Sequence, residues 1–317
     1  MNFTTKIPIS KSNFPIDYAS KIVSLGSCFA ENMAEKFAFY KFQNTTNPFG
    51  IIFNPVSMER IVQRIVNKDL FIENDIFFHN ERWHCFEVHS DVSYQDKDQF
   101  LKNLNTILEA THQQIIQSTH VIITYGTSWV YRLKTSAAVV ANCHKVPQNQ
   151  FDKEIVSVEA IEKSIRNTMD LIRKVSPNCH FIFTVSPVRH IKDGFVENQR
   201  SKAHLITALQ SIMNSKLGMA NYFPSYEIVM DELRDYRFYE KDMLHPNAIA
   251  LDYIWERFCE SAISEESFDI MNEVAVIQKG LAHRPFNPNS ESHQQFLRNL
   301  QQKIEQLQHQ LPFLTFS

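Results

Sequence analysis

Three short runs of apolar residues stand out along the chain, and each is rich in β-branched or aromatic side chains. They cover residues 21–25, 120–125 and 180–185, and runs of this kind predict buried strands. Between them, residues 100–117 and 158–175 carry apolar side chains at spacings of three and four, which is typical of helices. Strands that alternate with helices predict an α/β fold with a central parallel sheet.

A turn of small or polar residues follows each predicted strand. The three turns begin at Gly26, Gly126 and Ser186, and the first leads into a predicted helix over residues 31–39. Because chemistry collects at the carboxyl ends of parallel strands, we expect these turns to meet at one edge of the sheet. Taken singly, each turn is equally compatible with ordinary turn chemistry.

The segment DMLHPN contains the strongest single signal for catalysis. Asp242 precedes His245 by three residues, so its carboxylate can accept a hydrogen bond from one ring nitrogen and leave the other free for a nucleophile. Pro246 argues against a helix through His245, and we expect Asn247 to cap a helix over residues 248–258. The alternative is a helix N-terminal turn that happens to contain both residues.

Composition and charge narrow the class of protein. The chain has 317 residues and a formal net charge of -3, which argues against a nucleic-acid binder and favours a small or neutral substrate. Its five cysteines are widely spaced without a CxxC pair, so we expect neither a disulfide framework nor a zinc site. No signal peptide or membrane span is apparent, and we expect a cytoplasmic protein that needs no cofactor and binds no membrane.

The strand signals end near Cys259, so we expect a main domain over residues 1–262 and a helical extension over residues 263–317. Within the extension, leucine and isoleucine recur at spacings of three and four, as in a short heptad seam. These positions are Leu297, Leu300, Ile304, Leu307 and Leu311. We favour a helix docked on the main domain, and the alternative is a homodimer formed through the C-terminal helix.

Several segments together resemble the GSCFA-domain family, which is similar to the SGNH/GDSL hydrolase superfamily. The matching segments are LGSCFAENM, NPFGIIFNP, YGTSWVY, ANCHK, SPVRH, YFPSYEI, DELRDYRFY and DMLHPN. The resemblance covers about residues 20–260. It implies a flavodoxin-like three-layer α/β/α sandwich around a parallel sheet, with the site of a hydrolase at the strand ends.

The resemblance also implies the roles of individual residues. An ungapped match places Cys28 at the nucleophile position, with His245 as the base and Asp242 as its partner. A thiol near a histidine and a helix N-terminus is readily activated. Ser27 is the alternative nucleophile, and Cys28 is otherwise a small buried hydrophobe.

The oxyanion hole is less clearly marked. The resemblance implies the backbone N–H of Gly50 as one donor, but Ser128 stands where the superfamily has an asparagine. Asn142 is a candidate for the missing amide, because losing one oxyanion donor costs about 10²–10³ in rate.

Five further residues are candidates for substrate binding: Gly126, Thr127, His144, Arg189 and His190. A guanidinium such as that of Arg189 suits a carboxylate or phosphate, and its alternative is an ion pair with the acidic residues 231–235. We therefore expect an esterase or acyltransferase that acts on an ester-linked acyl or acetyl group of a small molecule or glycan. The alternative is a non-catalytic binding module for a glycan or acylated ligand.

Overall fold

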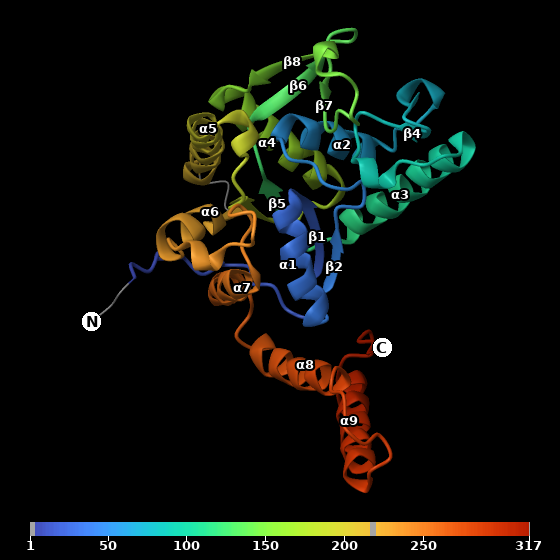
Figure 1. Cartoon of the computed structure of the whole chain (residues 1–317), viewed down its shortest axis with the longest axis vertical. Coiled ribbons are helices and arrows are strands. Elements are labelled where there is room, and N and C mark those ends of the chain that lie inside the picture. Colours follow the sequence, from blue (N-terminus) through green and yellow to red (C-terminus); the bar gives the residue numbers. More distant parts are fainter. Residues whose placement is uncertain (1–3, 216–219, 317) are drawn as a thin grey trace.

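The computed structural model describes residues 4–215 and 220–316 and contains a central sheet of five parallel strands in the order β10-β9-β5-β1-β2 (Figure 1). The strands are β1 (Lys21–Gly26), β2 (Gln43–Thr46), β5 (His120–Tyr125), β9 (His180–Val185) and β10 (Ala220–Phe223). The α/β class with a parallel sheet is therefore confirmed. The two outer strands, β2 and β10, were not predicted, because four polar or mixed residues give no apolar run.

Helices cover both faces of this sheet and give three layers. Successive residues of β5 alternate between the layers: Val121 and Ile123 join one apolar core, and Ile122 joins the other. Helices α2 (Pro55–Asn67), α3 (Lys97–Gln117), α4 (Val158–Val175) and α5 (Phe195–Asn214) pack on the first face. Helices α1 (Cys28–Phe39) and α7 (Ala248–Ala262) pack on the second. Because all five strands are parallel, their carboxyl ends share one edge of the sheet.

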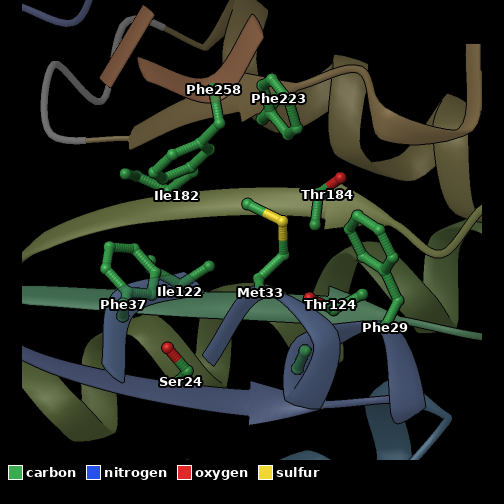
Figure 2. Close-up of a pocket in the computed structure, with 11 residues that line it drawn as sticks. Ser24, Phe29, Met33, Phe37, Ile122, Thr124, Ile182, Thr184, Phe223 and Phe258 are labelled. Atoms are coloured by element: carbon green, nitrogen blue, oxygen red, sulfur yellow. The ribbon is translucent and has the colours of Figure 1, made fainter. Parts of the chain in front are cut away.

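Helix α1 is fixed against the sheet by close packing. Phe29, Met33 and Phe37 point from α1 toward the strands and line a cavity of about 10 Å³ (Figure 2). A void of that size holds about one water at most, so the helix face is essentially filled. The packing fixes the direction of the first residues of α1, which lie beside the strand ends.

Short antiparallel sheets lie outside the central one. One joins β7 (Val139–Val140), β6 (Trp129–Leu133) and β8 (Phe151–Ile155), and the other pairs β3 (Phe77–His79) with β4 (Arg82–His84). We expected a loop or short hairpin over residues 139–147, and the structure has the two-residue strand β7 followed by a loop.

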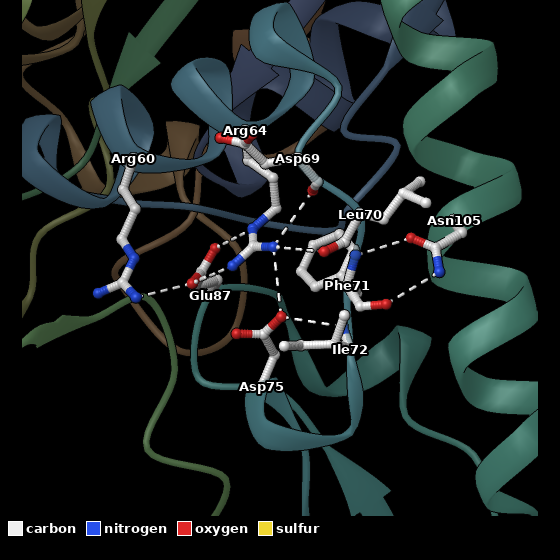
Figure 3. A network of polar contacts seen from close by, with 9 residues as sticks. All are labelled: Arg60, Arg64, Asp69, Leu70, Phe71, Ile72, Asp75, Glu87 and Asn105. Atoms are coloured by element: carbon white, nitrogen blue, oxygen red, sulfur yellow. Dashed lines mark hydrogen bonds and ion pairs between the residues drawn. The ribbon is translucent and has the colours of Figure 1, made fainter.

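An ion-pair network ties α2 to the loops near these sheets. Arg64 donates two hydrogen bonds to the carboxylate of Glu87, at 2.8 and 2.9 Å, and a third to Asp75 (Figure 3). Glu87 is nearly buried and Arg60 also pairs with it, at 2.8 Å. A bidentate arginine–carboxylate pair is geometrically specific, so the network fixes the segment that leads to His89.

The C-terminal extension is a pair of helices, α8 (Ser267–Leu281) and α9 (Glu291–Gln310), that projects from the main body (Figure 1). Ile304 and Leu307 of the heptad are buried, and Leu300 lies against Gly280 of α8, whereas Leu297 is 41% exposed. The heptad thus packs on α8, and α8 in turn joins the core beneath α1. The homodimer stays a prediction. In the described part of the chain, every helix is too short or too polar to cross a lipid bilayer.

Candidate functional site

The turn between β1 and α1 is held by backbone contacts that require glycine. Gly26 has φ of 134°, and a Cβ there would lie 2.1 Å from the carbonyl oxygen of Thr124. The N–H of Ser27 donates to that same carbonyl at 3.0 Å, and the N–H of Gly26 donates to Oδ1 of Asn47 at 2.8 Å. These contacts place Cys28 as the first residue of α1, at the carboxyl edge of the sheet.

The structure brings Cys28 and His245 together from opposite ends of the chain. The sulfur of Cys28 lies 4.0 Å from Nε2 of His245, at the outer limit of a sulfur hydrogen bond. Nδ1 of His245 lies 2.5 Å from Oδ2 of Asp242. A carboxylate only accepts, so the proton of a neutral imidazole sits on Nδ1 and Nε2 is free to take a proton from the thiol.

Local hydrogen bonds keep Asp242 ionised. Its Oδ1 accepts the backbone N–H groups of Leu244 and His245, at 2.9 and 3.0 Å. These bonds, with the side-chain bond to His245, lower the pKa of Asp242 to about 2. The side chains of Asp242 and His245 are 45% and 44% exposed. The pair is therefore a solvated one, held by its own turn.

Arg189 supports this turn. Its Nη2 donates to the carbonyl of Met243 at 2.8 Å, and its guanidinium lies over the ring of Tyr239. Met243 has φ of 61°, the left-handed conformation that lets the chain fold back between Asp242 and His245. The described structure shows no ion pair between Arg189 and residues 231–235, the alternative considered above. Asn247 caps α7 as expected, with Oδ1 accepting the N–H of Ala250 at 3.1 Å.

Ser27 and Cys28 differ sharply in their surroundings. Ser27 is fully buried, and its hydroxyl has no hydrogen-bond partner within the described residues. Cys28 is half-buried and faces His245. Burial raises the pKa of its thiol, and so does Glu31, while the N–H groups of Phe29 and of Cys28 itself lower it. The net shift is upward, so Cys28 is a thiol near neutral pH and needs a base.

Two candidate residues are buried and already hydrogen-bonded within the protein. His144 is 3% exposed, with Nε2 2.7 Å from the carbonyl of Cys85 and Nδ1 3.1 Å from the hydroxyl of Ser90. Ser128 is fully buried, and its hydroxyl donates to the carbonyl of Ser201 at 3.1 Å. Both side chains thus have partners in the fold, and the roles of His144 in substrate binding and of Ser128 at the oxyanion stay predictions.

The remaining oxyanion candidates are also engaged. Gly50 has φ of 75°, and its N–H donates to the carbonyl of Asn47 at 2.7 Å, so this donor is in use. Oδ1 of Asn142 accepts the backbone N–H of His144 at 2.8 Å, and the Ser90 hydroxyl lies 3.3 Å from it. No contact joins Asn142 to Cys28 or His245 in the described residues. Thr127 bonds through its hydroxyl to Ser201 of α5.

Gly126 and His190, by contrast, lie together at the edge. A Cβ on Gly126 would be 3.4 Å from Nε2 of His190 and 2.8 Å from the ring of Phe53. Burial and then the charge of Lys202 lower the pKa of His190 to about 4, so its imidazole is neutral at pH 7. Among the described residues, neither ring nitrogen has a hydrogen-bond partner.

Lys202 was not predicted. It projects from α5, is 1% exposed, and its Nζ donates to the carbonyls of Gly126 and Ser186, both at 2.7 Å. These carbonyls follow β5 and β9. The signal that could have found it is the buried stripe of α5, where polar residues stand at helical spacing in line with apolar ones. The stripe consists of Asn198, Ser201, Lys202, Leu205, Leu209 and Ile212.

No group of histidine, cysteine and acidic residues in the described part of the chain has the arrangement of a metal site. The carboxyl edge of the sheet carries a thiol, two imidazoles, a carboxylate and a buried ammonium. A thiol beside an oriented imidazole is the arrangement of a nucleophile with its base.

Comparison with known proteins adds the family. The model of the GSCFA family matches residues 21–258, and that of the GSCFA domain protein C-terminal domain matches residues 274–317. No curated relative matches. One similar solved structure is a carbohydrate esterase family 2 enzyme with a carbohydrate binding domain from Corynascus thermopiles (Myceliophthora fergusii).

That structure is 15% identical, with a TM-score of 0.29 over 45% of this chain and 36% of the other. The match therefore spans little more than a third of the esterase. The family model, in contrast, spans well over half of the present sequence, and the chain belongs to the GSCFA family.

Proposed function

We propose that this protein is an esterase or acyltransferase that uses Cys28 as its nucleophile. The observation that carries the proposal is the 4.0 Å contact between Cys28 and His245, two residues 217 positions apart in the sequence. Asp242 supports it, because its carboxylate holds the imidazole with Nε2 directed at the thiol.

The first half of the reaction forms an acyl-enzyme. Nε2 of His245 takes the thiol proton, and the sulfur of Cys28 forms a bond to the carbonyl carbon of the ester. The tetrahedral oxyanion collapses, the bond from carbon to the alcohol oxygen breaks, and His245 returns its proton to the departing alcohol. A thioester at Cys28 remains.

The second half releases the acyl group. His245 takes a proton from water or from an acceptor alcohol, whose oxygen attacks the thioester carbon. The carbon–sulfur bond breaks, and the thiolate regains its proton from His245. Water as acceptor gives hydrolysis, and an alcohol gives acyl transfer.

Three donors suit the oxyanion. The first amide N–H groups of α1, from Cys28 and Phe29, lie beside the nucleophile at the start of the helix and are among those that a helix leaves unbonded. The third donor is the neutral imidazole of His190, in the oxyanion-binding role that we had expected of Ser128 or Asn142. Its low pKa keeps it an uncharged N–H donor at pH 7.

The solvent exposure of Asp242 and His245 favours an ester substrate whose alcohol part is large. Because His245 is 44% exposed, the leaving oxygen faces solvent, and a bulky group attached to it can extend outward. A small-molecule or glycan ester with a short acyl group therefore fits the site.

The proposal is tested by trapping the acyl-enzyme. The full chain is mixed with p-nitrophenyl acetate, quenched in acid and analysed by peptide mass spectrometry. We expect an acetyl group on Cys28, and Cys28→Ala should abolish both the adduct and steady-state turnover. Cys143→Ala is the matched control, because Cys143 is the other half-buried thiol.

Two outcomes oppose the proposal. Turnover by Cys28→Ala at the rate of the Cys143→Ala control would remove Cys28 as nucleophile. A folded wild-type protein that neither acetylates Cys28 nor turns over any ester, yet binds a glycan, would favour a non-catalytic binding module.

A further inference from the structure

Lys202 carries an ammonium group into the interior without an acidic partner. Its side chain is 1% exposed, and its two hydrogen bonds go to backbone carbonyls of Gly126 and Ser186. In the described part of the chain no carboxylate forms an ion pair with it. Buried lysines are normally paired, because removing a charge from water is costly.

The arrangement leaves part of the ammonium free. Lysine has three N–H donors, and only two have acceptors among the described residues. Both acceptors lie at the carboxyl edge of the sheet, directly after β5 and β9. The third donor and the uncompensated charge are therefore located at the edge where Cys28 and His190 lie.

The groups that face Lys202 come from three elements. Cys28 of α1 lies at the same strand end, because the N–H of the preceding Ser27 donates at 3.0 Å to the carbonyl of Thr124, two residues before Gly126. His190 lies beside Gly126, and the ring of Tyr226 in α6 (Ser225–Glu227) is 5.6 Å from Nζ. Burial lowers the pKa of Lys202 to about 7, and ionised Cys28 opposes that shift. Reciprocally, the charge of Lys202 lowers the pKa of Cys28, which Glu31 and burial raise. Cys28 is therefore an ionisable group at the edge of the sheet where the Lys202 ammonium lies.

We propose that Lys202 is a positioning residue whose buried charge stabilises the negative charge that forms on the Cys28 sulfur and on the adjoining oxyanion. The part of this proposal that concerns the oxyanion rests on the proposed acyl-transfer function. Lys202 exchanges no proton in the reaction: His245 takes the thiol proton, and the resulting thiolate raises the pKa of Lys202 and so keeps its ammonium protonated. The buried pair is then neutral overall, which is why a lysine is tolerated here without a carboxylate.

The first test measures the thiol directly. Alkylation of Cys28 by iodoacetamide is followed by peptide mass spectrometry in the full chain, at pH 7 and at pH 11, where Lys202 is uncharged. We expect Lys202→Met to lower the ratio of the pH 7 rate to the pH 11 rate by about tenfold, as expected for the loss of a nearby opposite charge. Lys202→Arg should keep the ratio close to that of the wild type.

The matched control is Arg200→Met, which removes one positive charge from the exposed face of the same helix. It should leave the ratio unchanged. If Lys202→Met gives the same ratio as Arg200→Met, the proposal is overturned.

A second measurement needs no substitution at Lys202, in case Lys202→Met does not fold. Cys28 is alkylated either with iodoacetate, which adds a carboxylate, or with iodoacetamide, which adds a neutral amide of the same shape. The titration of Lys202 is then followed by ¹⁵N NMR of its ammonium nitrogen. We expect a higher midpoint in the carboxylate adduct by about one unit, and equal midpoints would contradict the proposal.

Neither measurement uses a substrate, so this inference and the proposed function fail separately. Loss of the Lys202 effect with acylation of Cys28 intact would leave the enzyme proposal standing. A clear Lys202 effect in a protein that never acylates Cys28 would support the electrostatic pair and reject the esterase.

Discussion

Two histidines, His245 and His144, show how differently the same ring can be used in one molecule. His245 lies on a solvated turn, with one nitrogen on Asp242 and the other facing a thiol. His144 is 3% exposed, and both its nitrogens are bonded to groups that hold two loops together. A histidine can act as a base only when a hydrogen bond orients one ring nitrogen and the other nitrogen has no partner in the fold.

The largest expected effect follows the replacement of His245 by glutamine, and the same replacement at His144 is the comparison. His245→Gln should lower kcat/KM for the ester by about 10⁴-fold, because the thiol loses its base. His144→Gln should stay within about threefold per folded molecule, since His144 does not face the thiol. Parallel steady-state assays with the folded fraction measured by circular dichroism check this. Equal losses in both variants would erase the distinction.

A smaller effect is expected at the partner of His245. Asp242→Asn should lower kcat/KM by about 10³-fold, because an amide at this position favours the wrong tautomer of the imidazole. The exposed turn lets solvent replace part of the interaction, so the loss should be less than that of His245→Gln. Asp235→Asn, in the same region but on another turn, is the control. An Asp242→Asn enzyme with wild-type kcat would show that the carboxylate only shapes the turn.

His190 is an intermediate case: it is partly buried, and in the described structure its ring nitrogens have no hydrogen-bond partner. His190→Phe should lower kcat by about 10²-fold with KM nearly unchanged, as for the loss of one oxyanion donor. His89→Phe serves as the control, because His89 is partly exposed and interacts with Asp91. A rise in KM with constant kcat would instead assign His190 to substrate binding.

The smallest expected effect is on stability, and it comes from His144. Burial lowers the pKa of His144 to about 4, against 6.5 for the free residue, so the unfolded chain binds more protons between these values. The free energy of unfolding should therefore be fully retained above pH 6.5 and decrease as the pH falls toward 4. The His144 share is roughly 3 kcal/mol.

Urea titrations at pH 7 and pH 4 measure this change in wild type and in His144→Gln. The variant should lose less stability on acidification than the wild type does. A wild-type slope in His144→Gln would assign the acid sensitivity to other groups, of which His190 is the first to examine.

Sequence patterns located the core strands because β5 and β9 are continuous apolar runs buried on both faces. They did not locate α5, because its buried stripe contains Asn198, Ser201 and Lys202, which interrupt the apolar spacing. The same three residues hydrogen-bond to the backbone of His190, Ser128 and Gly126, so their polar side chains hold the segments that follow β5 and β9. The three-stranded antiparallel sheet was missed for a simpler reason: its strands are short and half-exposed.

Neighbours along the chain decide the local features of this protein. The strand, glycine turn and helix around Cys28 follow from local pattern, and Asp242 reaches His245 because it stands three positions earlier, in a turn where Met243 is left-handed. Only the packed fold shows which of Ser27 and Cys28 faces His245, and that Lys202 is buried at the carboxyl edge of the sheet. Side-chain direction and burial depend on how α1, α5 and the central sheet pack, and those contacts join residues far apart in the chain.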